Sequence, residues 1–189
     1  MFEGKSNSEV FTYSLDLIQN ESDRGAALLA AMLTEHCLDQ LLEARLLPTI
    51  GDEKLLSGFN SPIGTFSAKI ELSYRVGIIP PGLAKLLNGL RKIRNSFAHE
   101  VTGSFDTPSV AAKTEAAFQT NPTHYQGFMD QWTGNINSVM SEHGIEHKVD
   151  ATTIKLRVRF NNYFAQTVTI LNSVSKDNLR LEPATYGKS

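Results

Sequence analysis

The chain has 189 residues, 41% of them hydrophobic, with a formal net charge of −2 and an isoelectric point near 6.2. This length suits one domain with a sizeable core, so we expect residues 1–189 to form a single domain. The balanced charge gives no global basic field that would indicate nucleic-acid binding. The single cysteine, Cys37, excludes an internal disulfide and a zinc–thiolate site, and a buried thiol is expected there.

Apolar segments long enough for a membrane or a leader are absent from the sequence. The longest apolar run, residues 25–33, is too short to span a bilayer, and the first residues lack a signal-peptide pattern. We therefore expect a cytoplasmic protein that does not associate with membranes. A phosphate-binding loop and a Ser-His-Asp arrangement are also absent, so no cofactor is predicted.

Helical periodicity accounts for most of the first hundred residues. Ser8 suits the N-cap of a short helix to residue 20, and Ser22 suits the cap of a long, apolar helix to about residue 47. Thr65 precedes a third helix over 66–76, which Gly77 ends. A proline pair at 80–81 begins a fourth helix, which extends to about residue 99.

The second half of the chain is less regular. Residues 102–149 are rich in Gly, Thr, Ser and Asn, which predicts an irregular insertion or arm with modest helices over 108–119 and 128–140. Asp150 suits the cap of a last long helix over 151–175, and residues 176–189 are expected to form a flexible tail. The predicted class is all-α: a bundle of four to five main helices with a less regular helical or loop insertion.

The fourth predicted helix carries the most informative residues. Apolar side chains recur on one side at steps of three and four, and Arg91, Asn95 and His99 recur at steps of four on another side. A polar stripe of this kind is commonly a solvated helix face, and a histidine near a helix C-terminus also suits the helix dipole. The alternative is a functional row of a cation, an amide and an imidazole.

Residues 94–99 resemble the Arg-Asn-x-x-x-His motif of the HEPN superfamily, whose members are dimeric helical bundles that include metal-independent ribonucleases. The resemblance implies that Arg94 stabilises phosphate charge, that Asn95 orients a partner, and that His99 is a general acid or base. Positions 94 and 99 lie about 140° apart on an ideal helix, so one copy does not easily direct both at one atom. Two such helices paired across a two-fold axis could do so.

A longer resemblance covers residues 21–100. The segments 21–25 (ESDRG), 55–70 (LLSGFNSPIGTFSAKI) and 91–99 (RKIRNSFAH) are similar, in this order, to the mannitol operon repressor family. The family is all-helical and acts in transcriptional regulation without an ordinary helix-turn-helix. A short recognition helix with a basic N-terminal face is likewise not evident here.

The basic residues form two groups in the sequence. One group lies between positions 69 and 94 and consists of Lys69, Arg75, Lys85, Arg91, Lys92 and Arg94, with Glu71 as the one acid among them. The predicted contacts to nucleic acid or a partner are Arg24, Lys69, Arg75, Arg91, Lys92 and Arg94. Lys155, Arg157 and Arg159 form the second group, another candidate for phosphate contacts. Arg24 or Asp23 could pair with the row on the fourth helix, or could serve only in the first turn of the second helix.

A metal site is not predicted. His143 and His147 have a spacing that would suit a helix, but Gly144 lies between them and a third spaced ligand is missing, so an exposed loop is favoured. The leading hypothesis is a dimeric, non-enzymatic transcriptional regulator that binds DNA through phosphates or acts through a protein partner. The alternative is a HEPN-type ribonuclease that cleaves RNA with Arg94 and His99.

Overall fold

The structure is a computed structural model that describes residues 1–51, 54–58, 60–99, 103–174 and 180–183. Within these residues the chain forms seven α-helices and one short 3-10 helix and contains no strand, which confirms the predicted all-α class. Among the described helices, none has both the length and the apolar character needed to cross a membrane.

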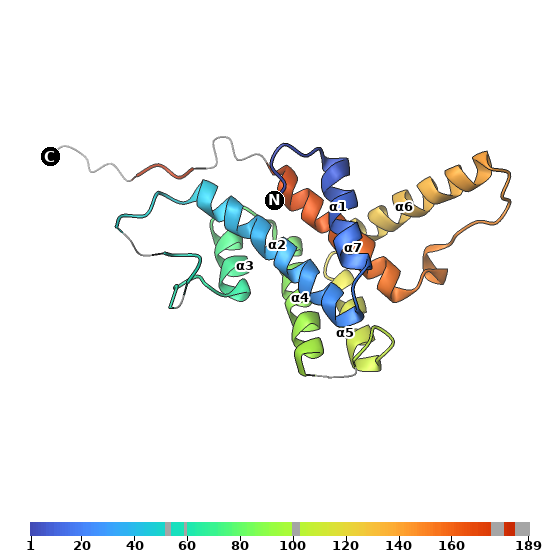
Figure 1. Cartoon of the computed structure of the whole chain (residues 1–189), viewed down its shortest axis with the longest axis horizontal. Helices are drawn as coiled ribbons and strands as arrows, with labels where there is room; N and C mark the ends of the chain where they lie inside the picture. Colours follow the sequence, from blue (N-terminus) through green and yellow to red (C-terminus); the bar gives the residue numbers. More distant parts are fainter. Residues whose placement is uncertain (52–53, 59, 100–102, 175–179, 184–189) are drawn as a thin grey trace.

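The long helix α2 lies in the middle of the bundle (Figure 1). It spans Asp23–Arg45 and packs against four other helices: α1 (Asn7–Gln19), α3 (Phe66–Arg75), α4 (Pro81–His99) and α7 (Leu156–Ser173). Its buried side includes Ala26, Ala27, Ala30 and Ala31, and such small side chains let neighbouring backbones approach. Cys37 is buried on this helix, as predicted.

The helix ends follow local capping chemistry. Ser6, and not Ser8, caps α1: its Oγ accepts a hydrogen bond from the Glu9 N–H at 3.3 Å. The Glu9 carboxylate in turn accepts from the Ser6 N–H at 2.8 Å, which completes a capping box and lowers the pKa of Glu9. Ser22 and Thr65 cap α2 and α3 as predicted.

The insertion is more helical than the sequence predicts. It contains α5 (Pro108–Phe118) and α6 (Pro122–Glu142), and α6 is 21 residues long where a short helix over 128–140 is predicted. Asn121 caps α6 by accepting from the His124 N–H at 3.4 Å, and Tyr125 and Met129 anchor its first half in the core. The second half projects from the body as an arm (Figure 1).

The last predicted helix begins later than expected. Asp150 caps only a 3-10 turn, Ala151–Thr153, because its carboxylate accepts hydrogen bonds from both the N–H and the hydroxyl of Thr152. These bonds lower the pKa of Asp150. The backbone is then extended at Ile154, and α7 begins at Leu156.

Part of the predicted flexible tail is bound to the bundle. The Leu181 N–H donates to the Arg45 carbonyl at 2.8 Å, and the Arg180 guanidinium donates to the Leu46 and Glu43 carbonyls at 3.0 and 3.2 Å. Residues 180–183 therefore cover open carbonyls at the C-terminal end of α2. Residues 176–179 and 184–189 of the predicted tail lie outside the described residues.

An aromatic cluster joins α5, α6 and α7. The Tyr163 ring lies 5.4 Å from the Phe118 ring, 5.0 Å from the Tyr125 ring and 5.3 Å from the Phe128 ring, measured between centroids. Tyr163 is 1% exposed, and its hydroxyl lies 3.1 Å from Nδ1 of His124. Burial raises the pKa of Tyr163 to about 12, with a smaller contribution from Tyr125.

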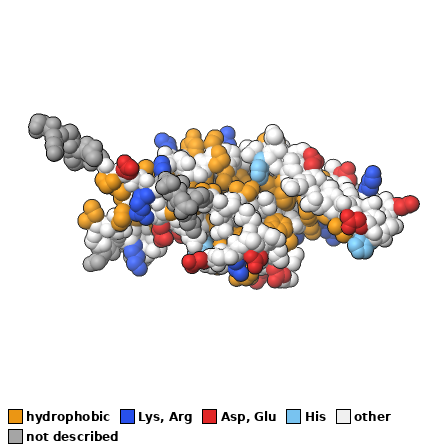
Figure 2. All heavy atoms as spheres, turned by 90° about the horizontal axis from the view of Figure 1, so that it is seen from above, with side chains coloured by type: hydrophobic (Ala, Val, Ile, Leu, Met, Phe, Trp, Pro, Cys, Tyr) orange, Lys and Arg blue, Asp and Glu red, His pale blue; other side chains and the backbone are white. Residues whose placement is uncertain are grey.

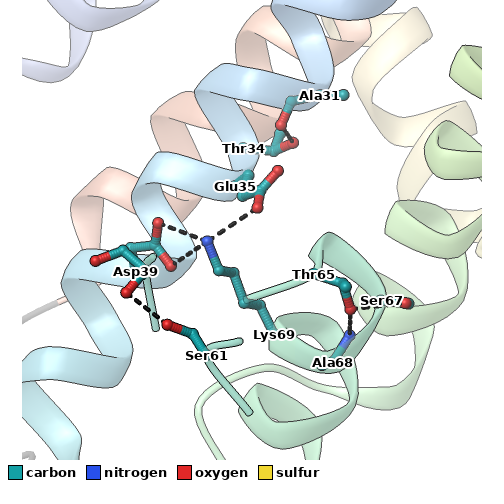
Figure 3. A network of polar contacts seen from close by, with 10 residues as sticks. Ala31, Thr34, Glu35, Asp39, Ser61, Thr65, Ser67, Ala68 and Lys69 are labelled. Atoms are coloured by element: carbon teal, nitrogen blue, oxygen red, sulfur yellow. Dashed lines mark hydrogen bonds and ion pairs between the residues drawn. The ribbon is translucent and has the colours of Figure 1, made fainter. Parts of the chain in front are cut away.

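Lys69 of α3 forms ion pairs with two carboxylates of α2 and so links the two helices (Figure 3). Its Nζ lies 2.9 Å from a Glu35 carboxylate oxygen and 2.8 Å from an Asp39 oxygen, and the lysine is 5% exposed. Burial alone would lower the pKa of Lys69, but the hydrogen bonds to Asp39 and Glu35 outweigh burial and raise it. Since Glu35 and Asp39 are four residues apart on one face of α2, a single ammonium group reaches both.

Replacing Lys69 should therefore destabilise the bundle more than replacing an exposed cation on the same helix. We expect Lys69→Met to lower the free energy of unfolding by about 1–3 kcal/mol, because two carboxylates then face each other without a cation. Arg75 is the matched control, since its ion pair with Glu71 is exposed, and Arg75→Met should cost clearly less than Lys69→Met. Urea unfolding measures both, and equal losses would contradict the assigned role of Lys69.

The buried Tyr163 hydroxyl predicts a loss of stability in alkali. An unfolded tyrosine ionises near pH 10.0, whereas Tyr163 in the fold ionises near 12, so the unfolded chain loses this proton first. Stability contributed by Tyr163 is complete below pH 10 and is lost as the pH rises toward 12. Urea midpoints measured across this range should fall less steeply for Tyr163→Phe. Identical pH profiles for the two proteins would contradict the prediction.

Candidate functional site

The candidate site is the C-terminal half of α4 and the arc of that helix that faces outward. Leu90, Ile93 and Phe97 are fully buried and hold this half of the helix in the core. On another side, α5 fixes it: Gly89 lies so close to Ala117 that a Cβ at Gly89 would come within 2.6 Å of the Ala117 Cβ. Two sides of α4 are thus occupied, and its remaining arc carries the predicted polar residues.

Arg94 and Asn95 are brought together. The Nε and Nη2 atoms of Arg94 donate to the Asn95 side-chain oxygen, at 3.3 and 3.1 Å, and both residues are half-buried. His99 is the last residue of α4 and is exposed. Within the described chain, neither Arg94 nor Asn95 has a hydrogen bond to His99, so one copy joins only two of the three motif residues.

The outward arc of α4 is basic. Lys85, Lys92 and His99 are exposed and recur at steps of seven, which places them in one row about 10 Å apart along the helix. Arg91 is half-buried beside this row, and its Nε has no hydrogen-bond partner among the described residues. In that same part of the chain, no ion pair involves Arg91 or either lysine of the row.

A further cation beside the motif is not evident from the sequence. Lys113 on α5 donates from Nζ to the Ser96 hydroxyl at 2.6 Å, and Ser96 lies between Asn95 and Phe97 within the motif. The two residues are 17 positions apart and meet only because α5 packs on α4. Lys113 therefore adds a positive charge on the side of α4 that faces α5.

Asp23 does not pair with the motif. Its carboxylate accepts from the Phe105 N–H at 2.9 Å and lies 3.6 Å from Nε of Arg157. Of the two residues predicted as alternative partners of the row on α4, Arg24 or Asp23, Asp23 has its partners on α7 and in the segment before α5. Arg24 is half-buried in the first turn of α2. Glu100 and residues 101–102 lie outside the described residues.

Two of the predicted contact residues are engaged within the fold. Lys69 is buried between Glu35 and Asp39, so it does not belong to an exposed basic surface. Arg75 is exposed, but its guanidinium pairs with Glu71 at 2.7 Å, which raises its pKa. The sequence does not reveal the Lys69 pairing, because its acidic partners lie 34 and 30 positions away.

Two residues of the second basic group, Arg157 and Arg159, likewise form hydrogen bonds within the fold. Arg157 donates from Nη2 to the Ile18 and Glu21 carbonyls at 3.1 and 2.9 Å, and burial lowers its pKa against the opposing effect of Asp23. Arg159 donates to the Glu115 carboxylate and to the Tyr125 hydroxyl. Only Lys155 of this group is exposed, so the group does not form a phosphate-binding patch.

Metal ligation has no support from the described residues. Among them, no group of three or more His, Cys, Asp or Glu side chains is placed to hold an ion. His143 is exposed, and its Nδ1 lies 2.8 Å from the Val139 carbonyl. His147 is exposed in the loop that follows α6. What the outward arc of α4 offers chemically is a set of cations and the exposed imidazole of His99.

Comparisons with known proteins leave the resemblances to the HEPN superfamily and to the mannitol operon repressor family as predictions. No protein-family model, no curated protein and no solved structure matches the chain. The function of the outward arc of α4 must therefore be argued from its own geometry.

Proposed function

We propose that the protein is a transcriptional regulator similar to the mannitol operon repressor family, acting as a dimer that contacts DNA phosphates through the outward arc of α4. The observation that carries the proposal is the positive charge of Lys85, Arg91 and Lys92 on this arc, none of which forms an ion pair with another described residue. Phosphate contacts by Lys and Arg supply most of the affinity in DNA binding that does not depend on base sequence.

Dimer formation is part of the proposal. Leu28 and Met32 lie four residues apart on α2 and are 40% and 62% exposed, although both are large apolar side chains. Residues four positions apart share one face of a helix, so the pair forms a small exposed apolar strip. A second copy that covers this strip would bring two α4 helices into one assembly. Sedimentation equilibrium of the wild type and of Met32→Lys tests this step.

Charge reversal on α4 should weaken DNA binding. We expect Arg91→Glu combined with Lys92→Glu to lower affinity for duplex DNA, and to reduce the slope of log affinity against log salt by about 0.9 for each lost phosphate contact. Lys148→Glu with Lys155→Glu is a matched control, since both lysines are exposed outside α4. Gel shifts across a salt series measure the slopes. Equal losses in the two double variants would contradict the assigned surface.

The absence of DNA binding by the wild type at physiological salt would leave only the partner-mediated form of regulation. Pull-down with the wild type and with the α4 double variant then decides between the two forms. A protein partner that is retained by the wild type and lost by the double variant would keep α4 as the contact surface. Equal retention by both would exclude α4 from it.

The second candidate function is a metal-independent ribonuclease. The observation that favours it is the open imidazole of His99 on the same helix as the Arg94–Asn95 pair. The ribose 2′-hydroxyl would attack the adjacent phosphate, the bond from phosphorus to the 5′-oxygen of the next nucleotide would break, and that oxygen would leave as a hydroxyl. His99 would transfer the protons and Arg94 would stabilise the developing charge. Since Arg94 is directed toward Asn95 in one copy, this reaction would need the His99 of a second copy.

Removal of the imidazole tests this candidate. If His99 transfers protons, His99→Ala should lower RNA cleavage in the presence of a chelator by about two to four orders of magnitude. His143→Ala is the control, since His143 is also exposed but lies at the end of α6. Cleavage is followed by gel analysis of a labelled single-stranded RNA. Equal trace cleavage by all three proteins would exclude the ribonuclease function.

A further inference from the structure

An apolar cavity lies between three helices, away from the outward arc of α4. It has a volume of about 210 Å³ and is lined by the N-terminal part of α4, the first turn of α6 and the second half of α7. The lining is mainly aliphatic, with Leu83 and Leu86 from α4, Ile170 from α7 and Val174 directly after α7. An apolar cavity of about 150 Å³ accommodates benzene, so this one has room for a single ring with a short substituent.

One wall of the cavity is polar, and its geometry is fixed by packing. The Tyr163 ring is held by the aromatic cluster, and its hydroxyl contacts Nδ1 of His124 at 3.1 Å. Thr167 also lines the cavity, but its hydroxyl donates to the Tyr163 carbonyl at 2.8 Å and is not free to donate to a ligand. Asn121 also lines the cavity, and its side-chain oxygen accepts from the His124 N–H, so the polar groups that a bound molecule would meet are the His124–Tyr163 pair and the Asn121 amide.

This polar wall favours a negatively charged group. Nδ1 of His124 contacts the Tyr163 hydroxyl, so Nε2 is the ring nitrogen that remains to donate to a ligand. His124 also lies in the first turn of the 21-residue helix α6, where the helix dipole is positive. The described lining contains no Asp or Glu that would repel an anion.

We propose that this cavity binds a small monocarboxylate with a compact apolar body, such as a single aromatic ring. The aliphatic walls from α4 and α7 enclose the ring, and His124 at the exposed end of the cavity contacts the carboxylate. This site goes beyond the proposed regulatory function, because neither Lys85, Arg91, Lys92 nor His99 lines the cavity. Binding can therefore be tested whether or not the protein binds DNA.

Three probes of related structure test the class of ligand. Phenylacetate has the ring and the carboxylate, 2-phenylethanol has the ring with a neutral group, and acetate has the carboxylate alone. Titration calorimetry and saturation-transfer NMR with the full chain should give a dissociation constant of about 1 mM or lower for phenylacetate. Affinities for the other two probes should be at least about tenfold weaker.

Variants then assign the binding to this cavity. His124→Ala should weaken phenylacetate binding about tenfold and leave 2-phenylethanol binding unchanged, whereas the control His143→Ala should change neither. Leu83→Trp and Ile170→Trp fill the cavity from opposite walls, and each should abolish phenylacetate binding. Two filling variants are used so that one remains informative if the other does not fold, as judged by circular dichroism.

Three results would overturn the proposal. The first is no phenylacetate binding to the folded wild type. The second is equal affinity for phenylacetate and 2-phenylethanol, which would mean that the His124–Tyr163 wall does not recognise the carboxylate. The third is binding that persists in a folded filling variant, which would place the bound molecule elsewhere.

Discussion

The close approach of helices to the N-terminal half of α2 is the constraint on which the rest of the fold depends. Ala26, Ala27, Ala30 and Ala31 are at most 1% exposed, and α1, α4 and α7 all pack on this helix. A larger side chain at any of these buried alanines would have to displace neighbouring atoms of the core, and overpacking of a core commonly costs about 1–3 kcal/mol. The positions of the other main helices therefore follow from the small residues of α2.

The packing of α4 follows from this arrangement and determines what the helix can present. Its core side faces α2 and α3, and α5 closes a second side at Gly89. The space left for solvent is the arc that carries Lys85, Lys92 and His99. Hydrophobic and charged side chains are also separated on the face shown in Figure 2. There the hydrophobic side chains lie over the middle and the charged side chains lie mainly toward the edges.

The elements that the sequence predicts well are those whose signal is local. The 3.6-residue periodicity of α2 and α4 and the caps at Ser22 and Thr65 depend on residues within one or two turns, so they can be recognised without the fold. The cap at Ser6 is also local, and its Ser-x-x-Glu pattern with Glu9 was a usable signal. The sequence predicts a shorter α6 because it does not show that Tyr125 is buried against Phe118 of α5 and Tyr163 of α7.

The roles of the basic residues could not be predicted in the same way. Lys69, Arg157 and Arg159 look like surface cations in the sequence, but each meets partners that lie 30 or more positions away. A cation whose partner is distant cannot be distinguished by spacing from one that stays open to solvent. The cavity beside Tyr163 is equally invisible in the sequence, since three separate helices form its walls.

The pairing of α1 with α7 has a consequence for how the protein acquires its structure. Arg157 of α7 donates to the Ile18 carbonyl across 139 positions of the chain, and the two helices pack along each other. During synthesis, α1 emerges long before α7, so its apolar side stays exposed to solvent until α7 is available to cover it. Such non-local contacts slow folding relative to helical proteins that are built from neighbouring hairpins. The apolar side of α1, with Val10 and Ile18, is thus a surface on which a chaperone could bind the nascent chain.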